Sequence, residues 1–312
     1  MIKQTIRIGT RGSQLALYQA NKVKDKIEKT FPDLATEIII IHSKGDKILD
    51  VALSKIGDKG LFTKELEEAM FRNEVDMAVH SLKDLPTTLP EGLKVGAVLS
   101  RAEVCDALVS LNGLTLNDLT PEMKIATSSL RRKAQLLKLN PNFNIVDIRG
   151  NVNTRLRKME EGYCDAMLMA AAGLQRLGLD KYISEIIDPN TILPAVSQGA
   201  IAIESRINDA VVDNVLNTIN DQLTFQVTTA ERIFLRSLEG GCQIPIGCYS
   251  ELKEDELSLK GFMAYVDGTQ IISHEVTGKL ADASQLATEL AEYFINNGSL
   301  YLLNKIRNFN TN

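Results

Sequence analysis

Long apolar runs are missing from this chain, and so are the common metal-binding patterns. No segment approaches the roughly 20 apolar residues of a membrane-spanning helix, and the opening stretch MIKQTIRIGTRGS is too poor in apolar residues for a signal-peptide core. A cytoplasmic protein without a membrane partner is therefore expected. The four cysteines form no C-x-x-C pair, and there are three histidines. We therefore expect no metal site, and free thiols in a reducing compartment.

Nucleotide-binding signatures are also missing. The chain contains neither G-x-x-x-x-G-K-[ST] nor G-x-G-x-x-G, which disfavours a nucleotide ligand. The formal net charge of −5 argues against a nucleic-acid partner. Yet the segment from Glu122 to Asp180 holds ten Lys/Arg and six Asp/Glu, so it carries +4 and the remainder carries −9. A basic region in an acidic chain indicates a small anionic ligand, or else a solvated helix face.

Strand-like and helix-like patterns alternate over the first part of the chain. Each short apolar or β-branched run is followed by an amphipathic helix, a pattern typical of parallel sheets flanked by helices. The expected strands are Ile6–Gly9, Glu37–His42, Asp76–His80, Lys124–Ala126, Asn144–Ile148 and Ala166–Ala170. The expected helices are Ser13–Lys29, Thr63–Arg72, a helix capped by Ser128 or Ser129 that ends at Leu139, and Thr154–Glu161. Ser43–Gly60 is expected to be a mobile loop.

Three domains are expected from this organisation. RIGTRGSQLA resembles KIATSSLRRKA, which suggests two similar, doubly wound α/β domains around a cleft, a usual place for a ligand. The first would comprise residues 1–99 with 200–220, and the second residues 100–199. Residues 221–312 follow a different pattern, which predicts a smaller α+β domain. It consists of a helix, the strands Leu257–Val266 and Gln270–Thr277 joined by a DG turn, and the helix Ala283–Asn296.

Basic residues gather at the turns between strands and helices. One turn holds Arg11 and Ser13, a second holds Ser129, Arg131 and Arg132, and a third holds Arg149, with Arg155 one turn into its helix. Free N–H groups at helix N-termini bind anions, and arginine pairs bidentately with carboxylate. A single arginine would be explained by a surface ion pair, but the set predicts a ligand with several phosphates or carboxylates.

Two further segments hold candidate chemical groups. HSLKDLP places Lys83 beside Asp84 after a strand, where an ionised carboxylate can stabilise a cation or move a proton, or simply cap a turn. LEGGCQIPIG places Cys242 in a tight loop without a nearby histidine. That thiol either reacts or is incidental.

Taken together, these segments resemble the porphobilinogen deaminase (hydroxymethylbilane synthase) family. The resemblance rests on IRIGTRGSQLALYQA, GLFTKELEEAM, DMAVHSLKDLPT, ATSSLRRKAQLL, DIRGNVNTRLRKM, AAGLQRLGL, LPAVSQGAIAIE and LEGGCQIPIG, which span residues 6 to 247 in the family's order. It fades after Gly247. The resemblance implies a periplasmic-binding-protein-like fold with a C-terminal domain, and a monomer.

The resemblance also implies an activity and a set of residues. The enzyme would condense four porphobilinogen molecules head to tail into hydroxymethylbilane, releasing ammonia, on a dipyrromethane cofactor held covalently by Cys242. Asp84 would be catalytic. The other implied residues are Lys83, Ser129, Arg131, Arg132 and Arg155 for the cofactor, Arg11, Ser13, Arg149 and Arg176 for the substrate, and Lys55, Lys59 and Phe62 in the mobile loop. Each pyrrole carries an acetate and a propionate, which accounts for the many arginines.

Two residues depart from the family pattern, and two rival functions stay open. Cys105 stands where the family usually has arginine, and Ala202 stands where glycine is usual, so a methyl there would crowd a close backbone approach. A non-enzymatic anion-binding protein would also suit two α/β domains. An RNA-binding role for the basic middle would show nucleic-acid affinity that falls steeply with salt.

Overall fold

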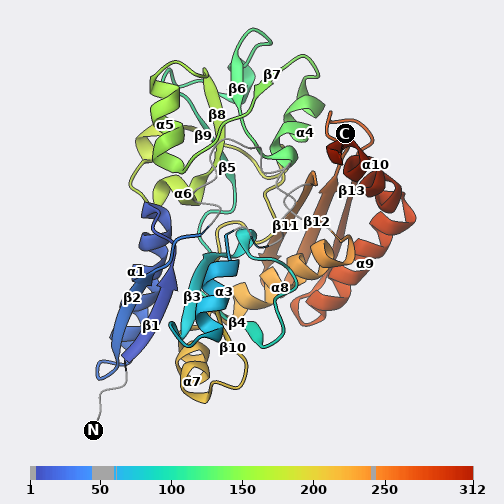
Figure 1. Ribbon diagram of the computed structural model, residues 1–312. Coiled ribbons are helices and arrows are strands. Elements are labelled where there is room, and N and C mark those ends of the chain that lie inside the picture. The colour runs from blue at the N-terminus through green and yellow to red at the C-terminus, as the bar shows by residue number, and fades with distance from the viewer. Residues whose placement is uncertain (1–4, 44–59, 61, 240–243, 312) are drawn as a thin grey trace. The chain divides into compact units, whose positions relative to one another are not determined.

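The computed structural model describes residues 5–43, 60, 62–239 and 244–311. Within these residues the chain forms two compact units, which are described one at a time (Figure 1). The first unit contains the chain up to Ala102 together with Gly199–Gln226, and the second contains Glu103–Gln198 and the chain from Val227 onward. The three domain boundaries expected from the sequence stay a prediction.

The first unit is built on a mixed five-stranded sheet. Its strand order is β2-β1-β3-β10-β4, where β1 is Thr5–Thr10, β2 is Ala35–Ile40, β3 is Met77–Ser81, β4 is Leu93–Val98 and β10 is Ile201–Arg206. Strands β2, β1 and β3 run parallel, but β10 is antiparallel to both β3 and β4. The strands expected from the sequence, β1, β2 and β3, are thus parallel as predicted, whereas β4 and β10 were not expected, and β10 enters the sheet in the opposite direction.

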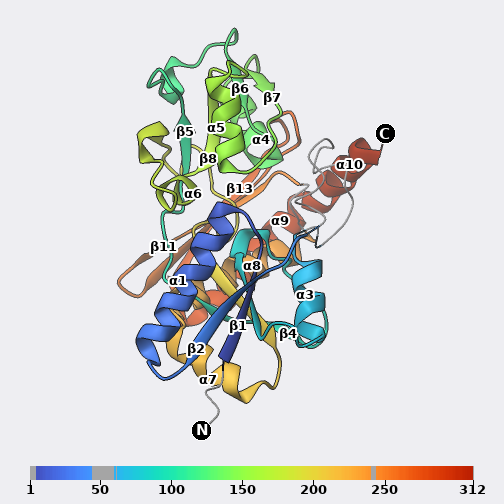
Figure 2. The ribbon, with the colours of Figure 1, turned by 60° about the vertical axis from the view of Figure 1, so that its left-hand side comes forward.

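Helices cover both faces of this sheet. Helices α1 (Gln14–Thr30) and α7 (Ala210–Ile219) pack on one face, over Ile8, Val79 and Ile203. Helix α3 (Lys64–Phe71) packs on the other face, against Ala78, and Figure 2 shows α1 and α3 on opposite sides of the strands. Alternate residues of each strand therefore face different helices, as the two-residue period of a strand requires.

Helix α1 follows directly from its sequence. Its buried residues include Ala16, Ala20, Val23 and Ile27, which recur at helical spacing and make one apolar face. The Ser13 side chain accepts a hydrogen bond from the Ala16 N–H and so caps the first turn. The predicted helix is confirmed, and its cap places Ser13 at the end of β1.

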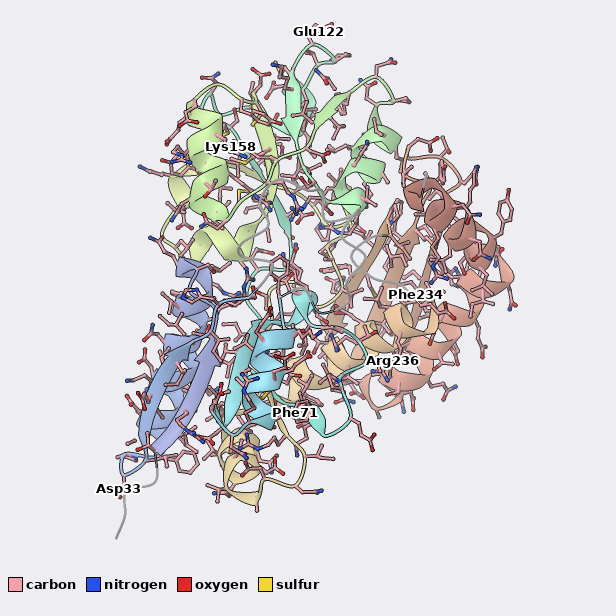
Figure 3. The ribbon with its side chains drawn as sticks, viewed as in Figure 1. Asp33, Phe71, Glu122, Lys158, Phe234 and Arg236 are labelled. Carbon is pink, nitrogen blue, oxygen red and sulfur yellow. The ribbon has the colours of Figure 1, made fainter. Side chains whose placement is uncertain are left out.

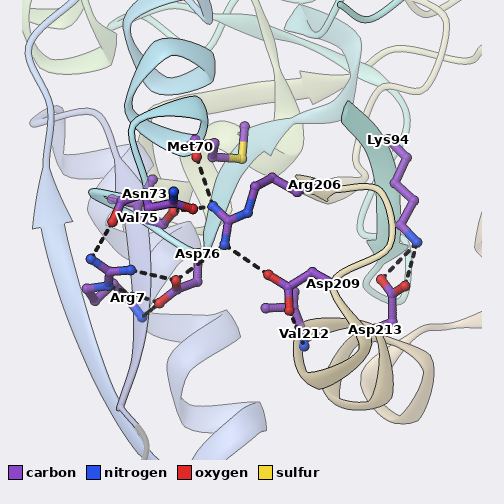
Figure 4. Close-up of polar contacts among 10 residues, drawn as sticks. All are labelled: Arg7, Met70, Asn73, Val75, Asp76, Lys94, Arg206, Asp209, Val212 and Asp213. Carbon is purple, nitrogen blue, oxygen red and sulfur yellow. Dashed lines mark hydrogen bonds and ion pairs between the residues drawn. The ribbon is translucent and has the colours of Figure 1, made fainter. Parts of the chain in front are cut away.

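At the other end of the sheet, a network of ion pairs ties α3 to the strands (Figure 4). Arg206 donates to the carbonyl oxygens of Met70 and Val75 at 2.9 and 2.8 Å, and it pairs with Asp209 at 2.9 Å. Asp76 pairs with Arg7 at 2.7 Å and with Arg206 at 3.4 Å. These contacts fix the C-terminal end of α3, far along the sheet from the carboxyl ends of β1 and β3.

The second unit contains another mixed sheet, with strand order β7-β6-β8-β5-β9. Strand β6 is parallel to β7 and β8, whereas β5 is antiparallel to β8 and β9. Leu136 of α4 lies on one face with Leu168, and Leu156 of α5 lies on the other with Met167. The elements are β5 (Asp106–Val109), β6 (Lys124–Ala126), α4 (Leu130–Leu139), β7 (Asn144–Val146), α5 (Val152–Glu160), β8 (Ala166–Ala170), α6 (Ala171–Gln175) and β9 (Ile183–Ile186).

The C-terminal part of this unit is an antiparallel sheet, β11-β12-β13, packed against helices. The predicted hairpin of β12 and β13 is confirmed, and β11 is an additional strand that the sequence analysis missed. Phe234, which is labelled in Figure 3, meets Phe294 edge to face at 5.0 Å in the core between helix and sheet. The elements are α8 (Gln222–Ser237), β11 (Ile246–Lys253), β12 (Glu256–Met263), β13 (Ile272–Lys279), α9 (Ala283–Asn296) and α10 (Ser299–Thr311).

Short 3-10 helices complete the described chain: Leu82–Asp84, Leu116–Asp118, Asp180–Tyr182 and Leu280–Asp282. Among the described helices, none has the length and apolar character to cross a membrane.

Candidate active site

A small pocket in the first unit brings together several of the predicted residues. It encloses about 70 Å³, room for water molecules rather than for a whole pyrrole with its side chains, so a substrate would occupy it only in part. Arg11 and Ser13 line it from the end of β1, and Ser81 and Asp84 line it from the end of β3. The other lining residues are Leu15, Ala16, Gln19, Phe62, Thr63, Val79 and His80.

The sheet topology explains why these residues meet. Strands β1 and β3 are parallel neighbours, so their carboxyl ends lie at the same edge of the sheet, where ligands bind in open α/β folds. Asp84 is exposed and ends the 3-10 helix that follows β3. The Leu82 N–H donates to the Ala200 carbonyl at 3.0 Å, which holds that helix against the start of β10. The neighbouring Lys83 is half-buried.

Arg11 lies under an aromatic ring. Its guanidinium carbon is 4.2 Å from the centroid of Phe62, within the range of a cation–π interaction. Both side chains are half-buried, so together they form one wall of the pocket. Of the three residues expected in the loop before α3, Phe62 is described at this wall, while Lys55 and Lys59 lie outside the described residues.

Gln19 belongs to the pocket but was missed from the sequence. Its side chain is 2% exposed, and its Nε2 donates to the Ser81 hydroxyl at 2.8 Å. The contact links α1 to the end of β3. The sequence could have revealed Gln19, because it lies beside Ala16, Ala20 and Val23 on the buried face of the predicted helix. A buried amide needs a hydrogen-bond partner, so a polar residue at that position indicates a specific contact.

The second unit holds a buried group of charges at the start of α4. Arg131 Nη1 and Arg132 Nη2 lie 2.8 and 2.7 Å from the two carboxylate oxygens of Asp106, which is fully buried. Gln198 Nε2 donates to the same carboxylate at 2.9 Å. Burial alone would raise the pKa of Asp106, but the two guanidinium charges outweigh it and hold that pKa well below its usual value. Burial lowers the pKa of Arg131 despite the attraction of Asp106.

Both arginines at the start of α4 are buried and paired with an acidic residue. Arg131 and Arg132 are 5% and 7% exposed, and both guanidinium groups contact Asp106, a partner that the sequence analysis did not name. One carboxylate balances one of the two positive charges, so the group carries a net charge of +1. The Nε atoms of Arg131 and Arg132 have no hydrogen-bond partner in the described part of the chain. A buried excess of positive charge favours an anion nearby.

The third predicted turn is built around Gly150. Its φ of +115° is a backbone angle that residues with a side chain rarely adopt. The next residue, Asn151, caps α5 by accepting a hydrogen bond from the Thr154 N–H. Arg155 Nε donates back to the Gly150 carbonyl at 2.8 Å, and Lys158 Nζ donates to the Arg149 carbonyl at 3.2 Å. Burial lowers the pKa of Arg149. Arg149 and Arg155 thus lie at the N-terminal end of one helix.

Two other predicted residues of this unit lie on helix ends. The Ser129 hydroxyl accepts from the Arg132 N–H at 3.4 Å and caps α4, and Arg176 is the half-buried C-cap residue of α6. Cys242 lies outside the described residues. The predicted residues therefore form two described sets, one in each unit, and the cleft that would join them stays a prediction. No metal-binding group of His, Cys, Asp or Glu occurs among the residues described.

The two departures from the family pattern are both buried. Ala202 is fully buried in β10 and packs with Leu82, Leu85 and Val98, so its methyl fills an apolar cluster. Cys105 is 9% exposed, and burial, together with the nearby Glu103, raises the pKa of its thiol to about 12. It therefore stays a neutral thiol beside Asp106.

Comparisons with known proteins match almost the whole chain. Residues 6–214 match the family model "Porphobilinogen deaminase, dipyromethane cofactor binding domain". Residues 225–296 match "Porphobilinogen deaminase, C-terminal domain", so the resemblance does not fade after Gly247. A porphobilinogen deaminase from Carboxydothermus hydrogenoformans is 46% identical over 98% of both chains, and one from Desulforamulus reducens is 48% identical over 98% of this chain and 99% of the relative.

Among solved structures, a TRAP periplasmic solute binding protein from Desulfovibrio salexigens aligns with 74% of this chain and 77% of its own, at a TM-score of 0.44 and 12% identity. This likeness is too distant to bear on function.

Proposed function

Since the chain belongs to the porphobilinogen deaminase family, we propose that Asp84 carries the chemistry of its reaction and that the two sets of basic residues hold the carboxylates. The family's enzymes are transferases of tetrapyrrole biosynthesis. They are hydroxymethylbilane synthases, which join four porphobilinogen molecules head to tail and release ammonia. They use a dipyrromethane cofactor.

The observation that supports a role for Asp84 is its place in one pocket with Arg11 and Ser13. Loss of ammonia from porphobilinogen leaves an electron-poor pyrrole cation. A carboxylate close to the pyrrole N–H stabilises that positive charge, and the same group is placed to accept the proton lost from the attacking carbon. Arg11 and Ser13 would bind a substrate acetate or propionate beside Asp84, with Arg149 and Arg176 completing the substrate set.

The basic set of the second unit suits the cofactor. The excess positive charge around Asp106 and the helix N-termini capped by Ser129 and Asn151 are complementary to a chain of pyrrole carboxylates. We assign cofactor binding to Lys83, Ser129, Arg131, Arg132 and Arg155. When bound, dipyrromethane supplies the pyrrole carbon to which the substrate units are added. The protein residues hold its carboxylates and keep it in place.

The covalent attachment is assigned to Cys242. A thioether needs a thiol but no histidine partner, because the cysteine is an anchor and is not regenerated in each turnover. The three described cysteines, Cys105, Cys164 and Cys248, are all buried. Lys55, Lys59 and Phe62 would cover the bound carboxylates. The protein is proposed to act as a cytoplasmic monomer without a nucleic-acid partner.

Exchange of Asp84 tests this proposal. Asp84→Asn removes the charge but keeps the size, and because Asp84 is exposed the variant should fold with an unchanged melting temperature. We expect its turnover of porphobilinogen to fall by about a hundredfold or more, while Asp84→Glu keeps a measurable part of the activity. Near-normal turnover in Asp84→Asn would remove Asp84 from the mechanism.

A further inference from the structure

A buried pair of titratable side chains lies beneath the pocket and has no role in the chemistry assigned above. His80 Nε2 is 3.0 Å from the Glu204 carboxylate, and the two side chains are 5% and 0% exposed. His80 is on β3, and Glu204 is on the neighbouring antiparallel strand β10. His80 is paired in register with Ala202 and Glu204 with Ala78, so the two side chains are diagonal neighbours on one face of the sheet.

The same face is covered by α3, which adds a third titratable group. Glu67 is 8% exposed; burial raises the pKa of its carboxyl, the Glu204 charge adds to that rise, and His80 opposes it. In the described part of the chain, neither Glu204 oxygen accepts a hydrogen bond of good geometry. Two carboxyl groups and one imidazole therefore share a buried site.

Stability alone does not account for such a pair. Taking charges out of water costs several kcal/mol per ion, and apolar residues of similar size often serve a core equally well. Polar side chains that converge on a pocket mark a candidate functional site. Here the pair adjoins one: His80 lines the pocket together with Arg11 and Asp84, the other charged groups that face it.

The strand end that carries Asp84 also depends on this pair. His80 is followed by Ser81 and by the 3-10 helix Leu82–Asp84. That segment is joined to β10 by the register pairs of His80 with Ala202 and Ser81 with Ile201, and by the hydrogen bond from Leu82 to Ala200. The contact between His80 and Glu204 is the side-chain link across the same two strands. His80 lies only four residues before Asp84 along the chain.

We propose that His80 and Glu204 are positioning residues for Asp84, which fix the end of β3 from which the Asp84 segment continues. This inference rests on the proposed role of Asp84. The pair would act through the segment that carries Asp84 and not on the reacting atoms themselves. It fixes where the Asp84 carboxylate lies relative to the bound pyrrole, and small displacements of a reacting group are costly in rate.

The test compares His80→Asn and Glu204→Gln with Arg206→Gln in the full-length, cofactor-carrying protein. Arg206 ties the same strand, β10, to α3 at the opposite end of the sheet (Figure 4). Its variant therefore reports what simple destabilisation of these elements does. Thermal unfolding, intact mass, kcat, KM and the pH profile of kcat are measured for each protein. Equal cofactor mass in every variant ensures that lost turnover is not a failure to load the cofactor.

We expect kcat to fall by about tenfold or more in His80→Asn and Glu204→Gln, with KM changed by less than about twofold. The double variant should be no worse than the poorer single one, because the two residues act as a unit. Both variants should change the shape of the pH profile. Arg206→Gln should lower the melting temperature and leave kcat and its profile as in the unaltered protein. If His80→Asn does not fold, His80→Gln takes its place.

Unchanged kcat in the His80 and Glu204 variants would overturn the inference. A second outcome would also overturn it. If kcat falls but the pH profile is unaltered, and Arg206→Gln lowers kcat equally at the same loss of stability, then His80 and Glu204 serve only to stabilise the fold. Failure of the underlying proposal looks different: Asp84→Asn would keep its turnover whatever the His80 and Glu204 variants do.

Discussion

The guanidinium carbon of Arg11 lies 4.2 Å from the centre of the Phe62 ring, at the wall of the pocket that also contains Asp84. A ring at this distance attracts the guanidinium and would restrict its movement. A carboxylate of the substrate would thus meet a guanidinium that is already placed, and less side-chain entropy would be lost on binding.

Phe62→Leu should therefore weaken substrate binding. A cation–π contact of this kind contributes about 1 kcal/mol, so we expect kcat/KM for porphobilinogen to fall about fivefold, mainly through KM. Phe62→Tyr keeps the ring and is the matched control. Steady-state kinetics on both variants provide the measurement, and equal KM values for the leucine and tyrosine variants would contradict this role of the ring.

Asp106→Asn should destabilise the second unit. The exchange leaves the guanidinium groups of Arg131 and Arg132 buried without their counter-charge, and breaking a buried pair in this way costs about 3 kcal/mol. Chemical unfolding followed by circular dichroism measures the difference. Asp118→Asn is the control, because Asp118 is exposed and accepts hydrogen bonds from Thr115 within its own turn.

The stability that the Asp106 ion pairs contribute should also depend on pH. The pKa of Asp106 is depressed in the folded protein, so its contribution is fully present above the unfolded value of about 3.9 and is lost as the pH falls from there toward the folded pKa. The stability difference between the unaltered protein and Asp106→Asn should therefore be constant near neutrality and shrink below about pH 4. A difference that grows in acid would contradict the assigned ion pairs.

Cys242→Ser should abolish the covalent adduct. The intact mass of the unaltered protein should exceed that of the bare chain by two pyrrole units, and the serine variant should have the bare mass. Cys248→Ser, at a fully buried thiol, should keep the adduct. An adduct that survives in Cys242→Ser, or an active protein without one, would remove Cys242 as the anchor.

Helix caps and turns could be predicted from the sequence, because they depend on residues that are close together along the chain. The caps formed by Ser13 and Ser129 and the turn at Gly150 follow from residue type and spacing. The helices and strands that surround them agree with the expected periodicities.

Contacts between distant segments were not readable in this way. Asp106 meets Arg131 and Arg132 only because β5 enters the sheet antiparallel to β8, and His80 meets Glu204 only because β10 returns from the second unit. The spacing of apolar residues along a strand does not show in which direction that strand enters a sheet. The C-terminal sheet was likewise predicted only in part: β12 and β13 were expected, and β11 was missed.

Incubation of the full-length protein with porphobilinogen tests the central claim most directly. Ammonia, residual substrate and product are measured in the same sample. The account predicts one ammonia released for each porphobilinogen consumed, together with a linear tetrapyrrole. Porphobilinogen that binds but stays intact, with no ammonia formed by protein carrying its adduct, would contradict it.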